Sequence, residues 1–182
     1  MIHFEIRDID AIDVSGRSIQ APHITPEHLR RRILDVLETT VLCSMATVTP
    51  DHTAHINTAY FACSDALELF FLSYPTSRHC RNLDANPSIA ITVFSSAQPW
   101  GDLGIGVQMF GRAGKVTDAG AEDAERWYGA RFPLYQTWKA SERADLARQY
   151  SFYRCLVNTV KLLDERTFGD AVFVHGVVHR DR

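Results

Sequence analysis

Apolar residues first recur at helical spacing shortly after the first two dozen residues of the chain. Thr25 can accept hydrogen bonds from the free amides at a helix start, and Pro26 suits the first turn. The apolar positions that follow lie three or four residues apart, which places them on one helix face. They are Leu29, Ile33, Val36 and Leu37. The pattern therefore predicts an amphipathic helix that begins at Thr25.

Beyond this helix the hydrophobic period changes to that of β-strands. Apolar or alternating segments with β-branched and aromatic residues are separated by short polar turns at 50–52 and at 64–65. The predicted strands are 41–48, 55–63, 67–73, 89–93, 107–116, 152–164 and 171–178. Gly111 and Gly114 interrupt one of these strands, which indicates a bulge or a close backbone approach.

Helical patterns also occur between the strands. They cover 78–85, 118–130 and 134–147. Short strands joined by tight turns favour a barrel or a sandwich over a parallel sheet. The pattern alone therefore predicts a fold that is mainly β with helices (α+β).

The length of 182 residues suits one compact domain. We expect residues 1–24 to form an N-terminal arm and residues 25–182 to form the domain. The apolar residues Phe4 and Ile6 fit either a short strand or an arm that lies on a partner. The sequence leaves both interpretations open for this segment.

Composition and charge narrow the class of protein. Hydrophobic residues make up 46% and charged residues 23% of the chain, which is typical of a folded globular domain. The formal net charge of −3 provides no basic field for nucleic acid or an anionic membrane. No signal-peptide core or membrane-length apolar run is found, so we expect a soluble cytoplasmic protein with neither kind of partner.

The cysteines and histidines do not form a recognisable metal or disulfide pattern. The four cysteines, Cys43, Cys63, Cys80 and Cys155, are scattered and contain no CxxC pair, which is typical of reduced and mostly buried thiols. The eight histidines include no HExxH motif, and each is more typical of a surface or core residue than of a ligand. We therefore predict no metal site.

A candidate anion site lies where the helix 78–85 begins. The hydroxyl groups of Thr76 and Ser77 stand near the free helix amides, and the helix dipole favours an anion there. Arg78 adds a planar guanidinium suited to phosphate oxygens, and His79 can donate a further hydrogen bond. The same residues also fit an ordinary helix cap followed by a solvent-exposed arginine, so the residues alone do not decide between a cap and an anion site.

The segment around this helix resembles the core signature of the pyridoxamine 5'-phosphate oxidase-like family of FMN-binding split barrels. The matching steps, in order, are Leu72-Ser73, Ser77-Arg78-His79, Asn86-Pro87 and the strand 89–94. Other segments follow the family order over about residues 25–175. The resemblance implies a split β-barrel of six to eight antiparallel strands with peripheral helices, and a flavoprotein oxidoreductase that uses FMN on a small-molecule substrate.

The resemblance also implies which residues contact the cofactor. The resemblance predicts that Asn57, Thr58, Ala59 and Tyr60 contact the flavin ring, largely through their backbone groups. It predicts that Ser73, Ser77, Arg78 and His79 hold the ribityl phosphate. It places Trp100 and Gln108 near the ring or across a dimer interface. The family usually builds this site between two subunits, so a homodimer is implied. No catalytic acid or base is assigned.

Departures from the family pattern limit the prediction of substrate. Pyridoxamine phosphate oxidases usually carry an arginine where Asn57 stands, a lysine near Ala62 and a second basic residue where His79 stands. The C-terminal substrate signature, rich in tryptophan and arginine, is also missing. We therefore do not predict vitamin B6 oxidation.

Three alternatives use the same barrel. One is a deazaflavin (F420) reductase with a similar basic phosphate cluster. Another is a haem-binding or flavin-storage protein without turnover, in which His79 or another histidine could be an axial ligand. The last is an interaction module with no cofactor. The aromatic residues between Trp127 and Trp138 are expected either to pack on the barrel or to form a lid that stacks on substrate or flavin.

Overall fold

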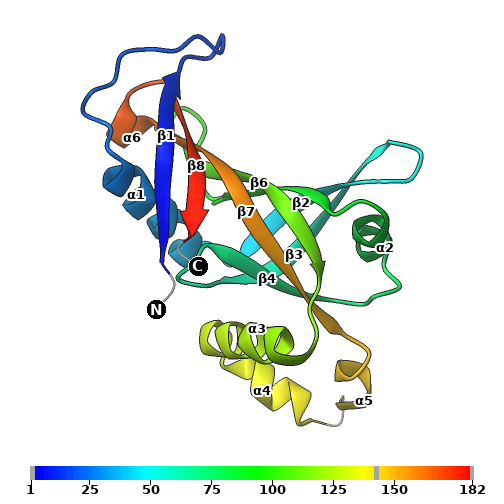
Figure 1. The fold of residues 1–182 in the computed structure, drawn as a ribbon. Coiled ribbons are helices and arrows are strands. Elements are labelled where there is room, and N and C mark those ends of the chain that lie inside the picture. Colours follow the sequence, from blue (N-terminus) through cyan, green and yellow to red (C-terminus); the bar gives the residue numbers. More distant parts are fainter. Residues whose placement is uncertain (1–2, 142–143, 181–182) are drawn as a thin grey trace.

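Antiparallel β-strands form the centre of the molecule in the computed structural model, which describes residues 3–141 and 144–180 (Figure 1). Eight strands lie in the order β1-β8-β7-β4-β3-β2-β5-β6, and a further pairing of β6 with β7 closes six of them into a barrel. The strands are β1 (Phe4–Ile12), β2 (Leu42–Val48), β3 (Ala54–Cys63), β4 (Glu68–Ser73), β5 (Ser88–Phe94), β6 (Ile105–Lys115), β7 (Ser151–Asp164) and β8 (Phe173–Arg180). The predicted split β-barrel is confirmed.

Helices lie around this barrel. Within the described residues they are α1 (Pro26–Thr39), α2 (Arg78–Ala85), α3 (Asp118–Arg131), α4 (Leu134–Lys139), α5 (Ala144–Ala147) and α6 (Glu165–Phe168). The predicted cap of α1 is confirmed, because the Thr25 hydroxyl accepts a hydrogen bond from the amide of His28 at 3.2 Å. Leu29 and Ile33 are fully buried between α1 and the sheet, as the spacing of the apolar residues predicts.

The barrel interior is filled by the inward residues of alternating strands. In β2, Cys43 and Met45 are buried while Ser44 and Ala46 face outward. The opposite walls contribute Phe61 from β3 and Val107 from β6. The interior is therefore a packed apolar core, and any binding site must lie at the edges or on the outside of the barrel.

The N-terminal segment forms a strand of the same sheet. β1 pairs antiparallel with β8, and Phe4 lies opposite Arg180 in this register. Phe4 and Ile6 are buried against the core, as a strand with an apolar face requires. The strand interpretation is thus the one that the structure shows for the described part of residues 1–23.

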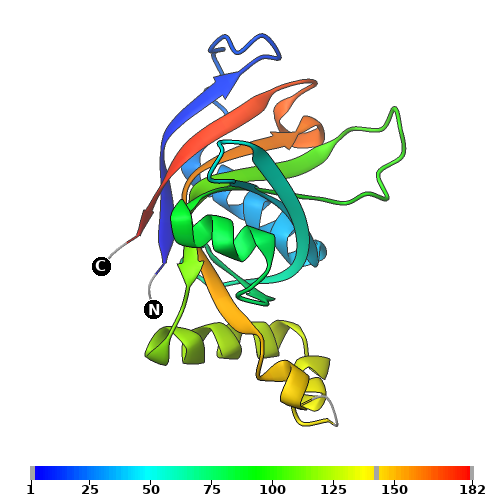
Figure 2. The same cartoon turned by 90° about the vertical axis from the view of Figure 1, so that its right-hand side faces the viewer.

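The helices α3 and α4 are inserted between β6 and β7 and cover one side of the barrel (Figures 1 and 2). A second apolar cluster joins Ala124 and Tyr128 of α3 to Phe70 of β4 and Phe152 of β7. The helical stretch predicted at 134–147 is interrupted, and residues 142–143 between α4 and α5 lie outside the described residues. The Ser141 hydroxyl donates to the carbonyl of Trp138 at 2.7 Å just after α4 ends.

Gly111 lies where the pairing of β6 with β7 slips by one residue, between Phe110 and Gly111. A Cβ atom at this position would overlap the carbonyl oxygen of Leu156 on β7. The predicted bulge or close approach is confirmed at Gly111. Gly114 pairs with Arg154 of β7 without a slip in register, and a Cβ atom at this position would meet no other atom within 4 Å. The prediction of a bulge or close approach at Gly114 is therefore wrong.

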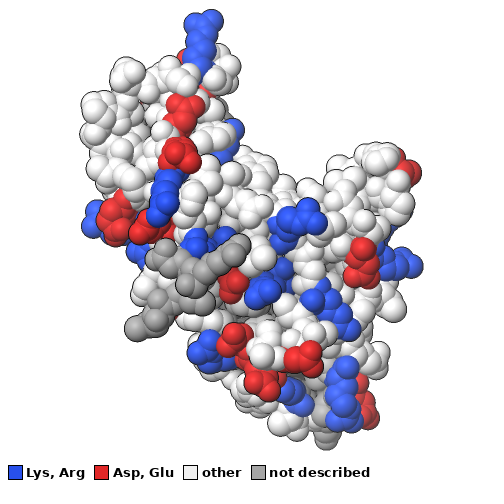
Figure 3. Space-filling view, in the orientation of Figure 1, with Lys and Arg blue, Asp and Glu red and all other residues white. Residues whose placement is uncertain are grey.

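Charged side chains are mixed over the face shown in Figure 3. Acidic and basic residues follow one another along β1, and both signs also occur over the α3–α4 insertion. Among the described residues, no helix has the length and apolar character needed to cross a membrane. The described residues also contain no group of three histidine, cysteine or carboxylate side chains that could hold a metal ion.

Candidate functional site

A cavity of about 700 Å³ lies between the barrel and the inserted helices. One wall comes from β3, and the polar end comes from β4 and the start of α2. The other wall comes from α3, α4 and the residue before β7. The lining residues are Asn57, Thr58, Ala59, Tyr60, Leu72, Ser73, Tyr74, Ser77, His79, Tyr128, Phe132, Leu134, Tyr135, Trp138 and Tyr150.

The wall formed by β3 is the free edge of a strand. β3 pairs with β2 along 54–60, but its pairing with β4 covers only 61–63. The backbone of 54–60 therefore has no strand partner on the β4 side in the described sheet. Backbone N–H and C=O groups on such an edge are free to bind a ligand. The opening of the barrel at this edge places Asn57 to Tyr60 against the cavity.

Hydroxyl and imidazole groups form the polar end of the cavity. Nε2 of His79 lies 2.7 Å from Oγ of Ser73 and 3.2 Å from Oγ of Ser77. His79 is only 7% exposed. Burial, and next the nearby His55, lower the pKa of His79 below the ordinary value for histidine. The imidazole is therefore neutral at neutral pH, and this end of the cavity offers hydrogen bonds more than fixed charge.

The start of α2 adds free backbone donors to this end. Ser77 is the N-cap, but its side chain accepts no hydrogen bond from the helix amides. The first N–H groups of a helix have no partner within it, and they carry the positive end of the helix dipole. Asn82 fixes the helix to the barrel by donating to the Thr47 hydroxyl at 3.0 Å. The predicted helix start therefore lies beside the cavity, with its amides uncapped by Ser77.

The structure brings together seven of the ten residues that the sequence assigned to a cofactor site. They are Asn57, Thr58, Ala59, Tyr60, Ser73, Ser77 and His79. Arg78 is exposed on α2 and does not line the cavity. It lies near Asp51, whose carboxyl pKa is lowered mainly by a hydrogen bond from Thr49 and to a smaller extent by Arg78.

Trp100 and Gln108 lie elsewhere on this chain. Trp100 is in the loop between β5 and β6 and is fully exposed. Gln108 is exposed on β6, opposite Thr92 of β5. Neither lines the cavity described above. Their assignment to a site completed by a second subunit stays a prediction.

The aromatic residues of the insertion pack on the barrel, which is one of the two alternatives that the sequence left open, and stacking on a substrate or flavin stays a prediction. Tyr128, Phe132 and Tyr135 pack against the second apolar cluster, and they also line the cavity together with Trp138. Trp127 packs on the same cluster without lining the cavity. Tyr74 and Tyr150 also line the cavity but were not predicted, because both lie in irregular segments next to strands, where no periodic pattern marks them.

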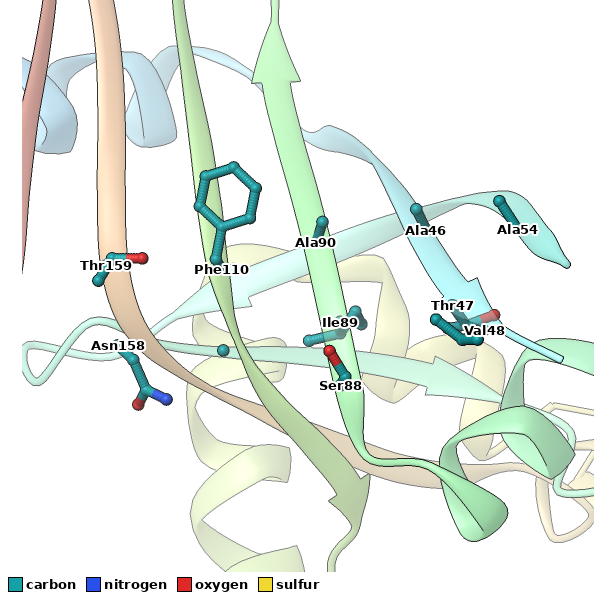
Figure 4. Close-up of a pocket in the computed structure, with 11 residues that line it drawn as sticks. Ala46, Thr47, Val48, Ala54, Ser88, Ile89, Ala90, Phe110, Asn158 and Thr159 are labelled. Atoms are coloured by element: carbon teal, nitrogen blue, oxygen red, sulfur yellow. The ribbon is translucent and has the colours of Figure 1, made fainter. Parts of the chain in front are cut away.

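A smaller hollow of about 330 Å³ lies on the outer surface of the barrel (Figure 4). Figure 4 shows Ala46, Ala90 and Phe110 side by side on three neighbouring strands. The strand registers place Ile56, Ala46, Ala90 and Phe110 in one row across β3, β2, β5 and β6. The row begins and ends with a large exposed apolar side chain, and two alanines form the depression between them.

Comparisons with known proteins place these features in a family. The family profile "Pyridoxamine 5'-phosphate oxidase" matches residues 29–151, which is more than half of the chain. No curated protein matches the chain in sequence.

Solved structures share the fold at low sequence identity. A protein of unknown function from Agrobacterium tumefaciens aligns with a TM-score of 0.64 at 19% identity, over 79% of this chain and 59% of its own length. A Listeria innocua protein assigned as a candidate pyridoxamine 5'-phosphate oxidase aligns with a TM-score of 0.59 at 16% identity. The alignment covers 74% of this chain and 98% of the Listeria protein. HutZ, the haem storage protein of Vibrio cholerae, aligns with a TM-score of 0.59 at 17% identity. The alignment covers 82% of this chain and 96% of HutZ.

Proposed function

Because the chain belongs to the pyridoxamine 5'-phosphate oxidase family, we propose that it is an FMN-dependent oxidoreductase that acts on a small organic substrate. The observation that carries this proposal is the cavity at the free edge of β3. It joins an open backbone edge, a hydroxyl and imidazole end beside a helix start, and an aromatic wall. The open backbone edge would hold the flavin ring, and the polar end would hold its phosphate tail.

The residues present fit each part of the cofactor. Asn57 to Tyr60 would hold the ring through the unpaired backbone of β3. Ser73, Ser77 and His79 would donate hydrogen bonds to the phosphate, together with the amides at the start of α2. When bound, FMN supplies the redox chemistry. The protein would bind and orient it.

Arg78 is proposed as the cation of the phosphate end, although its side chain does not line the cavity in this structure. It is the first residue of α2, directly before His79, which does line the cavity. Since His79 is neutral at neutral pH, the positive charge for a phosphate dianion must come from another residue. Arg78 is exposed and can supply it.

Titration with FMN, followed by quenching of flavin fluorescence, tests the proposal. The wild-type protein is expected to bind FMN. Thr58→Trp places a large ring on the exposed cavity face of β3 and is expected to weaken binding by at least about tenfold through steric exclusion. Glu122→Trp on the exposed side of α3 is the matched control and should bind as the wild type does. Equal FMN affinity in all three proteins would place the flavin elsewhere.

F420 and haem remain the alternatives to be separated from FMN. For haem, Nε2 of His79 would have to leave both hydroxyl groups that it contacts, Ser73 and Ser77, before it could bind iron. This favours a flavin over haem ligation by His79. Parallel titrations decide the matter: FMN is expected to bind more tightly than F420, and haem is expected to give no Soret band that depends on His79.

We also propose that the protein is a homodimer with the cofactor site at the interface. The row from Ile56 to Phe110 exposes apolar side chains on the outer barrel surface, with Ile56 69% and Phe110 41% exposed. The next row runs from Thr58, at the cavity, through Ser44 and Thr92 to Gln108. A twofold packing of these faces would bring Gln108 of one subunit towards the cavity of the other.

A further inference from the structure

Seven aromatic rings that line the cavity contact one another in an unbroken series. Between ring centroids, Tyr60 lies 5.6 Å from Phe132, and Phe132 lies 4.7 Å from Tyr128. The series continues through Tyr135, at 5.3 Å from Tyr128, and Trp138, at 6.1 Å from Tyr135. Tyr150 at 5.6 Å from Trp138 and Tyr74 at 4.0 Å from Tyr150 complete it. We call these seven residues the aromatic arch.

The arch is more than packing between the insertion and the barrel. Tyr128 contacts Phe152 and belongs to the second apolar cluster, which holds α3 in place. Trp138 lies outside that cluster and contacts only other residues of the arch among its ring neighbours. Leu134, at the rim, is 80% exposed. The insertion therefore presents an apolar ring surface to the cavity rather than using all of it in the core.

The cavity lining carries hydroxyl groups but no permanent charge. None of its fifteen described lining residues is Asp, Glu, Lys or Arg. Burial raises the pKa of Tyr128 to about 12 and that of Tyr135 to about 12. Both phenols therefore stay protonated at neutral pH and act as hydrogen-bond donors. Within residues 3–141 and 144–180, neither side-chain hydroxyl forms a hydrogen bond, which leaves both available to a ligand acceptor.

We propose that the rings of the aromatic arch other than Tyr60, which lies on the flavin side, bind the substrate, and that the substrate is an uncharged, planar aromatic molecule with a carbonyl acceptor. The inference rests on the proposed function, because it assigns the β3 side of the cavity to the flavin and the α3–α4 side to the substrate. A flat ring fits a wall of rings through stacking and edge contacts. A carbonyl oxygen accepts from the Tyr128 and Tyr135 hydroxyls, whereas a carboxylate would enter a lining without a fixed cation.

The test measures binding by calorimetry with three probes that separate ring, carbonyl and charge. 2-Acetylnaphthalene carries a flat ring and a ketone, 2-naphthoate replaces the ketone with a negative charge, and cyclohexyl methyl ketone keeps the ketone without the aromatic ring. Each is titrated into the wild-type protein with and without FMN. We expect 2-acetylnaphthalene to bind at least about tenfold more tightly than either control probe.

Variants locate that binding on the arch. Trp138→Leu removes one ring and Tyr135→Phe removes one hydroxyl, and each is expected to weaken 2-acetylnaphthalene about three- to tenfold. Trp127→Leu, in the same insertion but outside the cavity lining, is the matched control and should leave the probe affinity unchanged. FMN affinity should stay within about twofold in all three variants, which also shows that they are folded.

The outcomes separate this inference from the proposed function. Failure of the wild-type protein to bind FMN would contradict the proposed function itself. Normal FMN binding together with probe affinity that does not respond to Trp138→Leu or Tyr135→Phe would overturn only the substrate assignment. The substrate assignment would also be overturned if 2-naphthoate bound as tightly as 2-acetylnaphthalene, or if Trp138→Leu weakened FMN binding instead of probe binding.

Discussion

His79 joins the two hydroxyl groups at the polar end of the cavity, and its charge state decides what that end can bind. The helix start made His79 a candidate hydrogen-bond donor, and the family resemblance assigned it to the phosphate. The sequence could not predict that the imidazole is buried against Ser73 and Ser77 while the adjacent guanidinium is exposed. Burial of single side chains depends on the angle at which α2 meets the barrel, and that angle has no local signal.

Acid should destabilise the fold through His79. The pKa of His79 is lowered in the folded protein below 6.5, so between the folded value and 6.5 the unfolded chain binds more protons. Stability from this group is therefore present above pH 6.5 and is lost as the pH falls through the folded pKa. Urea unfolding at pH 7.5 and pH 5 should show a larger loss for the wild type than for His79→Gln. An equal loss of stability in the wild type and in His79→Gln would contradict a lowered pKa of His79 in the folded protein.

Arg78 should act on the phosphate and not on the ring. Arg78→Gln removes the cation proposed for the phosphate and should weaken FMN by about tenfold, the loss expected for one charge-assisted hydrogen bond. Riboflavin, which lacks the phosphate, should bind Arg78→Gln and the wild type equally. Arg81→Gln, an exposed arginine one turn further along α2, is the control. Unchanged FMN affinity in Arg78→Gln would remove this residue from the site.

At the scale of elements, the regular strands and helices followed from the period of their apolar residues, whereas the cavity did not. The strand β3 was predicted, but its free edge depends on where the pairing with β4 stops, at 61–63. Tyr74 and Tyr150 meet at 4.0 Å although they are far apart in the sequence. The short helix α6, capped by Asp164 through the amide of Thr167, was also not predicted because four residues carry too little pattern.

The position of α3 should depend on Arg131. Its guanidinium donates to the carbonyls of Leu37, at 2.6 Å, and Thr40, at 2.8 Å, and it lies over the ring of Phe61. Arg131→Met keeps the apolar stem but leaves the carbonyls at the end of α1 without this donor, so we expect a loss of about 1–3 kcal/mol in the free energy of unfolding.

Urea denaturation measures this loss. Arg126→Met removes an exposed ion pair with Asp123 and a contact between the Arg126 guanidinium and the ring of Trp127, and it should change stability by less than about 1 kcal/mol. If the two variants lose equal stability, Arg131 does not fix α3 to α1 in solution.

At the scale of the whole molecule, the exposed apolar row on the barrel is the feature that a lone chain does not explain. Phe110→Asp places a charge at the end of that row and should convert a dimer into monomers at the same concentration, as sedimentation velocity would show. Val14→Asp, on an exposed loop distant in sequence from the row, should leave the association state unchanged. A wild-type monomer, or a dimer that survives Phe110→Asp, would contradict the proposed interface.

FMN binding is tested most directly by the visible absorption spectrum of the freshly purified protein, with mass spectrometry of any small molecule released on denaturation. We expect the bands of an oxidised flavin and release of FMN, or the appearance of those bands in the protein fraction after FMN is added and the excess removed. A protein that carries no flavin and retains none after this treatment would contradict the assignment of the β3 cavity.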